Sequence, residues 1–167
     1  MKSREWSLKS EPEAPTVKLL LVHHAEAVQH EDDTRRPLSP RGVAQAGLGA
    51  LEAAGRGAKP SVVWHSGKLR ARQTAQAYWR ECNALAEFAA TQDLQPSDSP
   101  SRMRDRLRGE SRDVLVAGHF PHLPRLLSLL LNADASFPQH GVVALETTDE
   151  GETWTESWRF DPAAARP

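Results

Sequence analysis

Histidines and an arginine follow three separate apolar runs of this chain, and side chains of these types could bind and attack an anion. His24 comes directly after one run, Arg70 shortly after a second, and His119 directly after a third. In open α/β proteins, ligands bind beyond the carboxyl ends of the strands, so these side chains would meet at one edge of a sheet. Arg70 also falls in the first turn of a predicted helix, where free N–H groups favour an anion. The pattern predicts an anion site, and phosphate is the anion it favours.

A metal site built from histidines is the competing interpretation. His23 and His24 are adjacent, and adjacent side chains on a strand point to opposite faces, so one ion would rarely take both. The single cysteine, Cys82, excludes a cysteine-built zinc site and an internal disulfide framework. The sequence offers no partner that would give His140 a role. We therefore predict no metal ligands and keep metal catalysis as the less favoured alternative.

The elements that must position these residues alternate between strand and helix. The run at 18–22 is continuously apolar, as expected of a strand buried on both faces. Ser39-Pro40 and Ser99-Pro100 each combine an N-cap residue with proline at the first helical position. The predicted elements are a strand at 18–22, a helix from 40 to 55 or 57, a strand at 61–65, a helix from 69 to about 90 that breaks near 83, a helix from 100 to 109, a strand at 113–117, a helix at 123–131, and a hairpin of strands at 141–147 and 153–160.

This order of elements predicts the α/β fold class. Alternating strands and helices imply right-handed crossovers and a mainly parallel sheet with helices on both faces, and the closing hairpin makes the sheet mixed. The predicted organisation is a mobile arm at 1–16, one domain at 17–160 and a frayed tail at 161–167. No glycine-rich phosphate loop follows the first strand, which excludes the common nucleotide-binding folds.

Length and composition narrow the class of protein further. The chain has 167 residues, which suits one domain, and 39% hydrophobic with 26% charged residues is typical of a globular protein. Lysine plus arginine number 21 and aspartate plus glutamate 22, so no broad basic surface is available for nucleic acid. The apolar runs are too short to span a bilayer, and the first residues lack the apolar core of a secretory signal. The composition predicts a soluble, cytoplasmic domain.

Four short motifs follow one another in order between the first strand and the end of the helix at 123–131. They are His23-His24-Ala25-Glu26, Arg36-Pro37-Leu38-Ser39, Ser66-Gly67-Lys68-Leu69-Arg70 with Gln73-Thr74 behind it, and Gly118-His119-Phe120-Pro121. The ordered set resembles the histidine phosphatase superfamily, and specifically its SixA-type phosphohistidine phosphatase branch. The resemblance implies a three-layer sandwich of the phosphoglycerate mutase-like kind.

The resemblance also implies a covalent mechanism that needs no metal and no organic cofactor. His24 would be the catalytic nucleophile and would carry the phosphoryl group as phosphohistidine until water hydrolyses it. Arg36 and Arg70 would bind phosphate oxygens as planar forks, and His119 would be catalytic by donating a further hydrogen bond to the same group. In the family a carboxylate from a variable loop commonly protonates the leaving group. Here the nearest candidates are Glu26 and Asp98.

The sequence departs from the family at His23, where the family has an arginine. As a phosphate ligand, His23 would donate at most one hydrogen bond. A bound phosphate dianion would raise the pKa of His23 above its reference of about 6.5, because opposite charge favours the protonated form. Since His24 must be neutral to attack, the pair predicts activity within a narrow, mildly acidic to neutral range.

Two functions remain open from the sequence. The favoured one is a metal-independent phosphatase acting on protein phosphohistidine or on a small phosphomonoester. The alternative is a catalytically weak or inactive module that binds phosphate or a phosphoprotein, because His23 replaces the arginine. No long insertion is available to build a lid, and an open pocket favours a protein side chain over a small metabolite. Neither nucleic acid nor a membrane is an expected partner.

Overall fold

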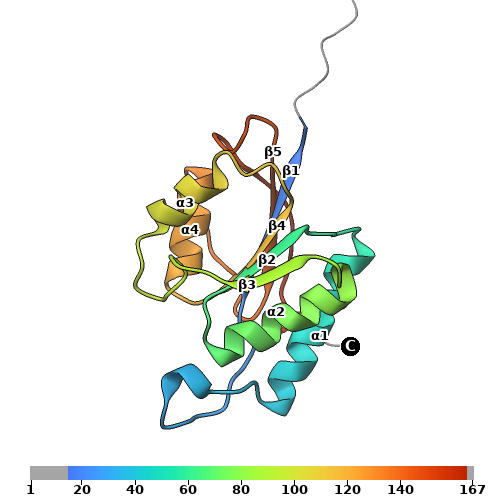
Figure 1. The fold of residues 1–167 in the computed structure, drawn as a ribbon, viewed down its shortest axis with the longest axis vertical. Helices are drawn as coiled ribbons and strands as arrows, with labels where there is room; N and C mark the ends of the chain where they lie inside the picture. The colour runs from blue at the N-terminus through green and yellow to red at the C-terminus, as the bar shows by residue number, and fades with distance from the viewer. Residues whose placement is uncertain (1–14, 165–167) are drawn as a thin grey trace, which may run out of the picture.

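Six strands form one mixed sheet in the computed structural model, which describes residues 15–164 (Figure 1). The strands lie in the order β3-β2-β4-β1-β5-β6, and β5 runs antiparallel to both of its neighbours whereas the other pairs are parallel. The strand bounds are β1 Val17–His23, β2 Val62–His65, β3 Glu87–Ala90, β4 Val114–Gly118, β5 Val142–Thr147 and β6 Thr155–Phe160. The predicted mixed, mainly parallel sheet is confirmed.

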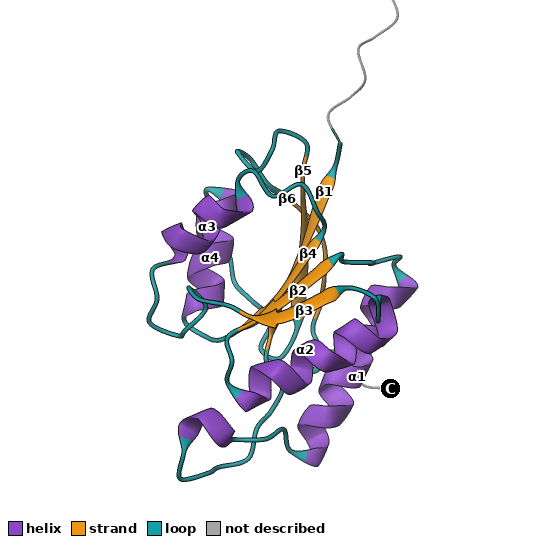
Figure 2. Ribbon diagram, in the orientation of Figure 1, coloured by secondary structure: helices purple, strands orange, loops and turns teal. Residues whose placement is uncertain are grey.

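Two helices cover each face of the sheet, which gives the three layers visible in Figure 2. The first pair packs together on one face and the second pair on the other. The helix bounds are α1 Pro40–Gly55, α2 Leu69–Cys82, α3 Pro100–Leu107 and α4 His122–Leu131. The short 3-10 helix η3 (Asp33–Arg35) lies between β1 and α1 and contacts α2.

The apolar run of β1 is continuous because both faces of this strand are buried. Leu19 and Leu21 belong to the core under α3 and α4, whereas Leu20 and Val22 belong to the core under α1 and α2. Successive side chains of a strand point to opposite faces, so one strand supplies both cores. Each such buried side chain contributes about 1.5–3 kcal/mol to folding. The strand that ends at the predicted nucleophile is thereby held from both sides.

The predicted helix from 69 to about 90 is confirmed up to the predicted break near 83 and is wrong beyond it. The helix α2 ends at Cys82, and residues 87–90 form β3, an edge strand parallel to β2. Asn83 adopts an extended conformation, and its side chain donates to the carbonyl of Pro60 and accepts from the backbone of Leu85. An edge strand is only partly buried, so β3 lacks the continuous apolar run that marks β1 and β4.

The other predicted elements are confirmed to within a few residues. The Ser39 side chain accepts a hydrogen bond from the backbone of Gly42, which is the expected N-cap of α1. The arm predicted at 1–16 lies outside the described residues, except for positions 15 and 16. Within the predicted tail at 161–167, residues 161–164 form a turn closed by Asp161, and the rest lies outside the described residues. Among the described residues, no helix has the length and apolar character that crossing a membrane requires.

Candidate active site

The carboxyl ends of β1 and β4 bring two of the predicted residues together. The register pairs His23 of β1 with Gly118 of β4, so the residues that follow, His24 and His119, leave the sheet side by side. Their ring centroids lie 5.1 Å apart. Arg70 lies in the first turn of α2, which follows β2, the other neighbour of β4. The three strand ends therefore meet at one edge of the sheet.

His24 is held as a neutral ring with one nitrogen free to attack. Its Nδ1 lies 2.8 Å from the carbonyl oxygen of Ala25, and because a carbonyl only accepts, Nδ1 carries the proton. The lone pair of the neutral ring is then on Nε2, which makes no hydrogen bond with the described residues. Burial, opposed by the hydrogen bond to Ala25 and aided by the charge of Arg70, lowers the pKa of His24 to about 4. The ring is thus uncharged at neutral pH, as a nucleophile requires.

His119 is buried and paired with a serine. Its Nε2 lies 2.6 Å from the hydroxyl of Ser66, which also accepts a hydrogen bond from the backbone of Lys68. Its Nδ1 is buried without a partner among the described residues. Burial lowers the pKa of His119 to about 2, so this ring is neutral as well. Because Nε2 of His119 already bonds Ser66, it could donate to phosphate only by sharing its proton between the two or by giving up the bond to Ser66.

Three cations of the site converge on one carboxylate, that of Asp33 in η3. The Nζ of Lys68 is 2.6 Å from Oδ2, the Nη2 of Arg70 is 3.4 Å from the same oxygen, and the Nη1 of Arg36 is 3.4 Å from Oδ1. The hydrogen bond from Lys68 and the charge of Arg70 hold the pKa of this half-exposed carboxyl well below its usual range. The structure thus brings the two predicted arginines together, around a carboxylate that the sequence analysis missed.

The guanidinium of Arg70 is anchored by a backbone oxygen and has one buried N–H without a partner among the described residues. Its Nη1 donates to the backbone carbonyl of Asp33 at 2.8 Å, while its Nε is buried without a partner among the described residues. Arg36 donates through Nε to the carbonyl of Val28 at 3.1 Å. Both arginines are therefore anchored by backbone oxygens and retain N–H groups that an oxyanion could accept.

His23 is buried between two aromatic rings. Its ring is stacked on Phe120, with centroids 4.0 Å apart, and on His140, with centroids 5.0 Å apart. Burial, together with the neighbouring His24, lowers the pKa of His23 to about 2. Without a bound anion the ring of His23 is therefore neutral, because it is stacked inside the protein rather than open to solvent. The raised pKa expected with a bound dianion, and the narrow pH range of activity that follows from it, stay predictions.

The sequence analysis also missed His140, which precedes β5. Its Nδ1 lies 2.8 Å from the backbone carbonyl of His24, and its backbone N–H donates to Nδ1 of His23 at 2.8 Å. The missed signal was topological. Because β5 runs antiparallel to β1, residues that precede β5 reach the same edge of the sheet as residues that follow β1.

Three histidines of this edge form the candidate metal cluster among the described residues. One ring nitrogen each of His23, His24 and His140 lies within 4.8 Å of the others. The Nδ1 of His23 accepts a backbone hydrogen bond, so its other nitrogen carries the proton and has no lone pair for a metal. Only two rings keep a free lone pair, which is fewer ligands than a zinc site needs. The donor set does not fit a metal ion.

The two candidate leaving-group acids are bound elsewhere. Glu26 accepts from the hydroxyl of Ser39 at 2.9 Å and lies 3.9 Å from Arg41. Asp98 accepts from the backbone of Gln95 at 2.9 Å. The described residues show no hydrogen bond from either carboxyl group to His24.

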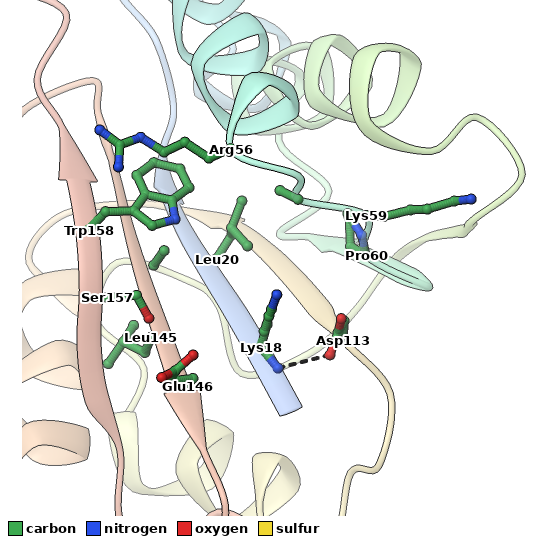
Figure 3. Close-up of a pocket in the computed structure, with 12 residues that line it drawn as sticks. Lys18, Leu20, Arg56, Lys59, Pro60, Asp113, Leu145, Glu146, Ser157 and Trp158 are labelled. Carbon is green, nitrogen blue, oxygen red and sulfur yellow. Dashed lines mark hydrogen bonds between the residues drawn. The ribbon is translucent and has the colours of Figure 1, made fainter. Parts of the chain in front are cut away.

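A separate cavity of about 150 Å³ lies at the other end of β1 (Figure 3). Its lining includes Lys18, Lys59 and Arg56, and the Arg56 guanidinium lies 4.9 Å from the centroid of the Trp158 ring. Lys18 is near the amino end of β1, whereas the histidines follow its carboxyl end. This cavity is therefore not part of the candidate active site.

Comparison with known proteins identifies the fold. No family model matches the chain, and no curated protein matches it. Among solved structures, the protein histidine phosphatase SixA complexed with tungstate has a TM-score of 0.81 at 22% identity, covering 90% of this chain and 100% of that chain. A protein assigned as the phosphohistidine phosphatase SixA of Agrobacterium tumefaciens has a TM-score of 0.75 at 22% identity, covering 87% and 98%.

More distant structures share the same architecture. The phosphoserine phosphatase of Entamoeba histolytica, in complex with 3-phosphoglyceric acid, has a TM-score of 0.63 at 16% identity and covers 86% of this chain and 96% of that chain. The fold is that of the histidine phosphatases. Within that class it matches the SixA-type structures, as the four motifs predicted.

Proposed function

We propose that this chain is a metal-independent phosphatase that transfers a phosphoryl group to His24 and then to water. The observation that carries the proposal is the Nδ1–H bond from His24 to the carbonyl of Ala25, which leaves a neutral ring with its lone pair on Nε2. A neutral imidazole at this position is a competent nucleophile toward phosphorus.

The reaction has two steps. In the first, the Nε2 lone pair of His24 forms a bond to phosphorus, and the bond to the leaving group breaks with its electrons going to the leaving atom. The phosphorylated ring gains positive charge, which the carbonyl of Ala25 stabilises through Nδ1–H. In the second step, water attacks phosphorus and the bond from phosphorus to Nε2 breaks with its electrons returning to Nε2. Both water protons leave on inorganic phosphate, and the neutral ring protonated on Nδ1 is restored.

The cations at this edge supply the charge that phosphoryl transfer needs. Arg36, Arg70 and Lys68 surround the carboxylate of Asp33, and the buried Nε of Arg70 has no partner among the described residues. Catalysis of phosphoryl transfer depends mainly on positioning and electrostatic stabilisation, which such donors provide. The tungstate in the SixA structure supports an oxyanion site in this fold.

Protein phosphohistidine is the favoured substrate class, ahead of a small phosphomonoester. The imidazole of a phosphohistidine whose other ring nitrogen is protonated leaves as a neutral group, whereas an alkoxide leaving group needs a proton from an acid. The two candidate acids are engaged by other partners, Glu26 by Ser39 and Asp98 by the backbone of Gln95. Cytoplasmic localisation stays a prediction from the composition.

A phosphoprotein-binding module is the second candidate function. It is favoured by one observation, the neutral state of His23 at the position where the family has an arginine, which leaves the site with one positive charge fewer. Binding and catalysis are separated by turnover, since a binding module would retain the oxyanion site without hydrolysing substrate.

The deciding experiment measures phosphate release from a phosphohistidine protein and from p-nitrophenyl phosphate in the presence of EDTA. We expect turnover by the wild-type chain, none by His24→Ala, and turnover unchanged in the control Asp134→Asn, which changes an exposed side chain outside the site. Vanadate binding by wild type without turnover would favour the binding module. Loss of turnover in EDTA, restored by zinc or manganese, would favour a metal enzyme.

A further inference from the structure

We propose that His140 is a positioning residue that fixes the proton of His23 on Nε2, so that His23 donates an uncharged hydrogen bond to the phosphoryl group. The inference rests on the proposed function only for the identity of the bound group. The hydrogen bonds on which the inference is based are formed within the chain and involve no ligand.

The first contact fixes the protonation of His23. The backbone N–H of His140 donates to Nδ1 of His23 at 2.8 Å, so this nitrogen must present its lone pair. A neutral imidazole has one donor and one acceptor, and the proton is therefore on Nε2. This nitrogen makes no hydrogen bond with the described residues, and it is not among their fully buried unpartnered atoms. The Nε2–H donor of His23 is therefore unpaired among the described residues and not fully buried.

The second contact holds His140 in place. Its ring Nδ1–H donates to the backbone carbonyl of His24 at 2.8 Å, and the next residue, Gly141, accepts from the backbone N–H of His23 at 3.0 Å. The backbone of His140 is left-handed, with φ of 59°, which is uncommon for a residue with a side chain. The segment before β5 is therefore attached to both histidines that end β1.

The surroundings of His23 keep its ring uncharged. The ring is 4% exposed and is stacked between Phe120 and His140. The groups that face it are His24, His119, His140 and Arg70, and all of them disfavour a further positive charge. The hydrogen bond that His23 offers is therefore not lost by deprotonation between pH 5 and 9.

The orientation of this proton decides whether the site attracts or repels a phosphoryl oxygen. The ring of His23 lies next to the attacking ring of His24, with centroids 4.4 Å apart. If the proton were on Nδ1, a lone pair would face the phosphoryl oxygens instead. A lone pair on His23 that faced a phosphoryl oxygen would leave both acceptors without a hydrogen bond, and this would weaken phosphate binding.

The test is nitrogen NMR of the imidazole rings in the folded wild-type chain, from pH 5.5 to 8. We expect His23 to be neutral with its proton on Nε2, and His24 and His140 to be protonated on Nδ1. Two variants follow. His140→Gly accepts the left-handed backbone without a side chain, and His140→Asn tolerates the same backbone while keeping an amide donor.

Both variants keep the backbone N–H of residue 140 and change only the ring that anchors it to the carbonyl of His24. Without that anchor, we expect His140→Gly to hold the N–H less firmly against His23 and to show both tautomers of His23. It should bind vanadate roughly 10-fold more weakly, about the value of one hydrogen bond to a charged group. His140→Asn should recover most of the affinity and the single tautomer. If His140 only supported the fold, its substitution would not change the tautomer of His23, and His140→Asn would not restore vanadate affinity relative to His140→Gly.

A His23 ring protonated on Nδ1, or doubly protonated at pH 7, would overturn the inference, and the wild-type spectrum alone decides this point even if a variant does not fold. Unchanged vanadate affinity in folded His140→Gly would overturn it as well. The predicted tautomers and vanadate binding without turnover would instead reject the proposed function and leave the inference standing.

Discussion

The positions of single protons and charges govern the chemistry at this edge of the sheet. His24 keeps its proton on Nδ1 because Ala25 offers only an acceptor, and His23 keeps its proton on Nε2 because His140 offers only a donor. Two adjacent histidines therefore hold their protons on opposite ring nitrogens, as the proposed roles of nucleophile and donor require. Two imidazoles that behave alike in solution thus take different tautomers here, each fixed by one hydrogen bond.

Asp33 sets the charge of the oxyanion site, and its removal gives a prediction at this scale. The substitution Asp33→Asn should tighten vanadate binding on the order of fivefold at low salt, because three cations would then face the anion without an internal carboxylate. The gain should shrink as ionic strength rises, since the carboxylate is half-exposed and its charge is screened. The measurement is the vanadate inhibition or dissociation constant at two salt concentrations.

The matched control is Asp134→Asn, which removes an exposed carboxylate outside this cluster. It should leave vanadate binding unchanged. Weaker binding by Asp33→Asn would contradict the prediction and would mean that Asp33 serves to hold the cations in position.

At the scale of elements, the two helices that begin with Ser-Pro differ in how they are capped. The hydroxyl of Ser39 accepts from the backbone of Gly42 at the start of α1 and donates to the carboxylate of Glu26. Ser99 stands at the corresponding place of α3, but its side chain makes no capping hydrogen bond. The same Ser-Pro signature therefore has different energetic weight in the two helices.

This difference gives a second prediction. Ser39→Ala should lower the free energy of unfolding by about 1–2 kcal/mol, the value of a helix N-cap in a buried setting. Ser99→Ala should change it by less than about 0.5 kcal/mol, as expected for an exposed substitution. Chemical denaturation of both variants checks the pair, and equal losses would show that capping at Ser39 is not what stabilises α1.

Most of the strands and helices could be predicted from the sequence, because a buried strand is a continuous apolar run and a helix start is marked by its capping residues. The strand at 18–22 is apolar throughout since both its faces are buried, and Ser39-Pro40 marks the start of α1. The edge strand β3 was missed because partial exposure removes that signal, and an alanine-rich stretch is equally compatible with a helix. His140 and Asp33 were missed because their partners are distant in sequence or depend on a short turn.

At the scale of the whole molecule, acid lability of the fold is a consequence of the buried histidines. Burial is the main cause that lowers the pKa values of His23 and His119 to about 2 and that of His24 to about 4. Unfolding returns these rings to a pKa of about 6.5. Below that pH the unfolded chain binds protons that the folded chain does not, so stability falls as pH falls.

We expect the free energy of unfolding to decrease between pH 7 and pH 5, by about 1.4 kcal/mol per pH unit for each such histidine once the pH is well below 6.5. The depressed pKa of Asp33 acts in a separate window, because its stabilisation is lost only as pH falls below that of an ordinary carboxyl. His119→Gln should make the free energy of unfolding less dependent on pH, by about 1.4 kcal/mol per pH unit, because one titrating histidine is removed. A free energy of unfolding that is flat from pH 7 to 5 would contradict the neutral state of these rings.

The central claim is that His24 carries the phosphoryl group during turnover. The most direct measurement is a rapid quench into alkali of wild type reacting with p-nitrophenyl phosphate or a phosphohistidine protein, followed by mass spectrometry of the peptides. We predict an acid-labile phosphoryl group on His24 alone, and none in His24→Ala. Turnover with no phosphorylated protein, or with the group on another residue, would contradict the account.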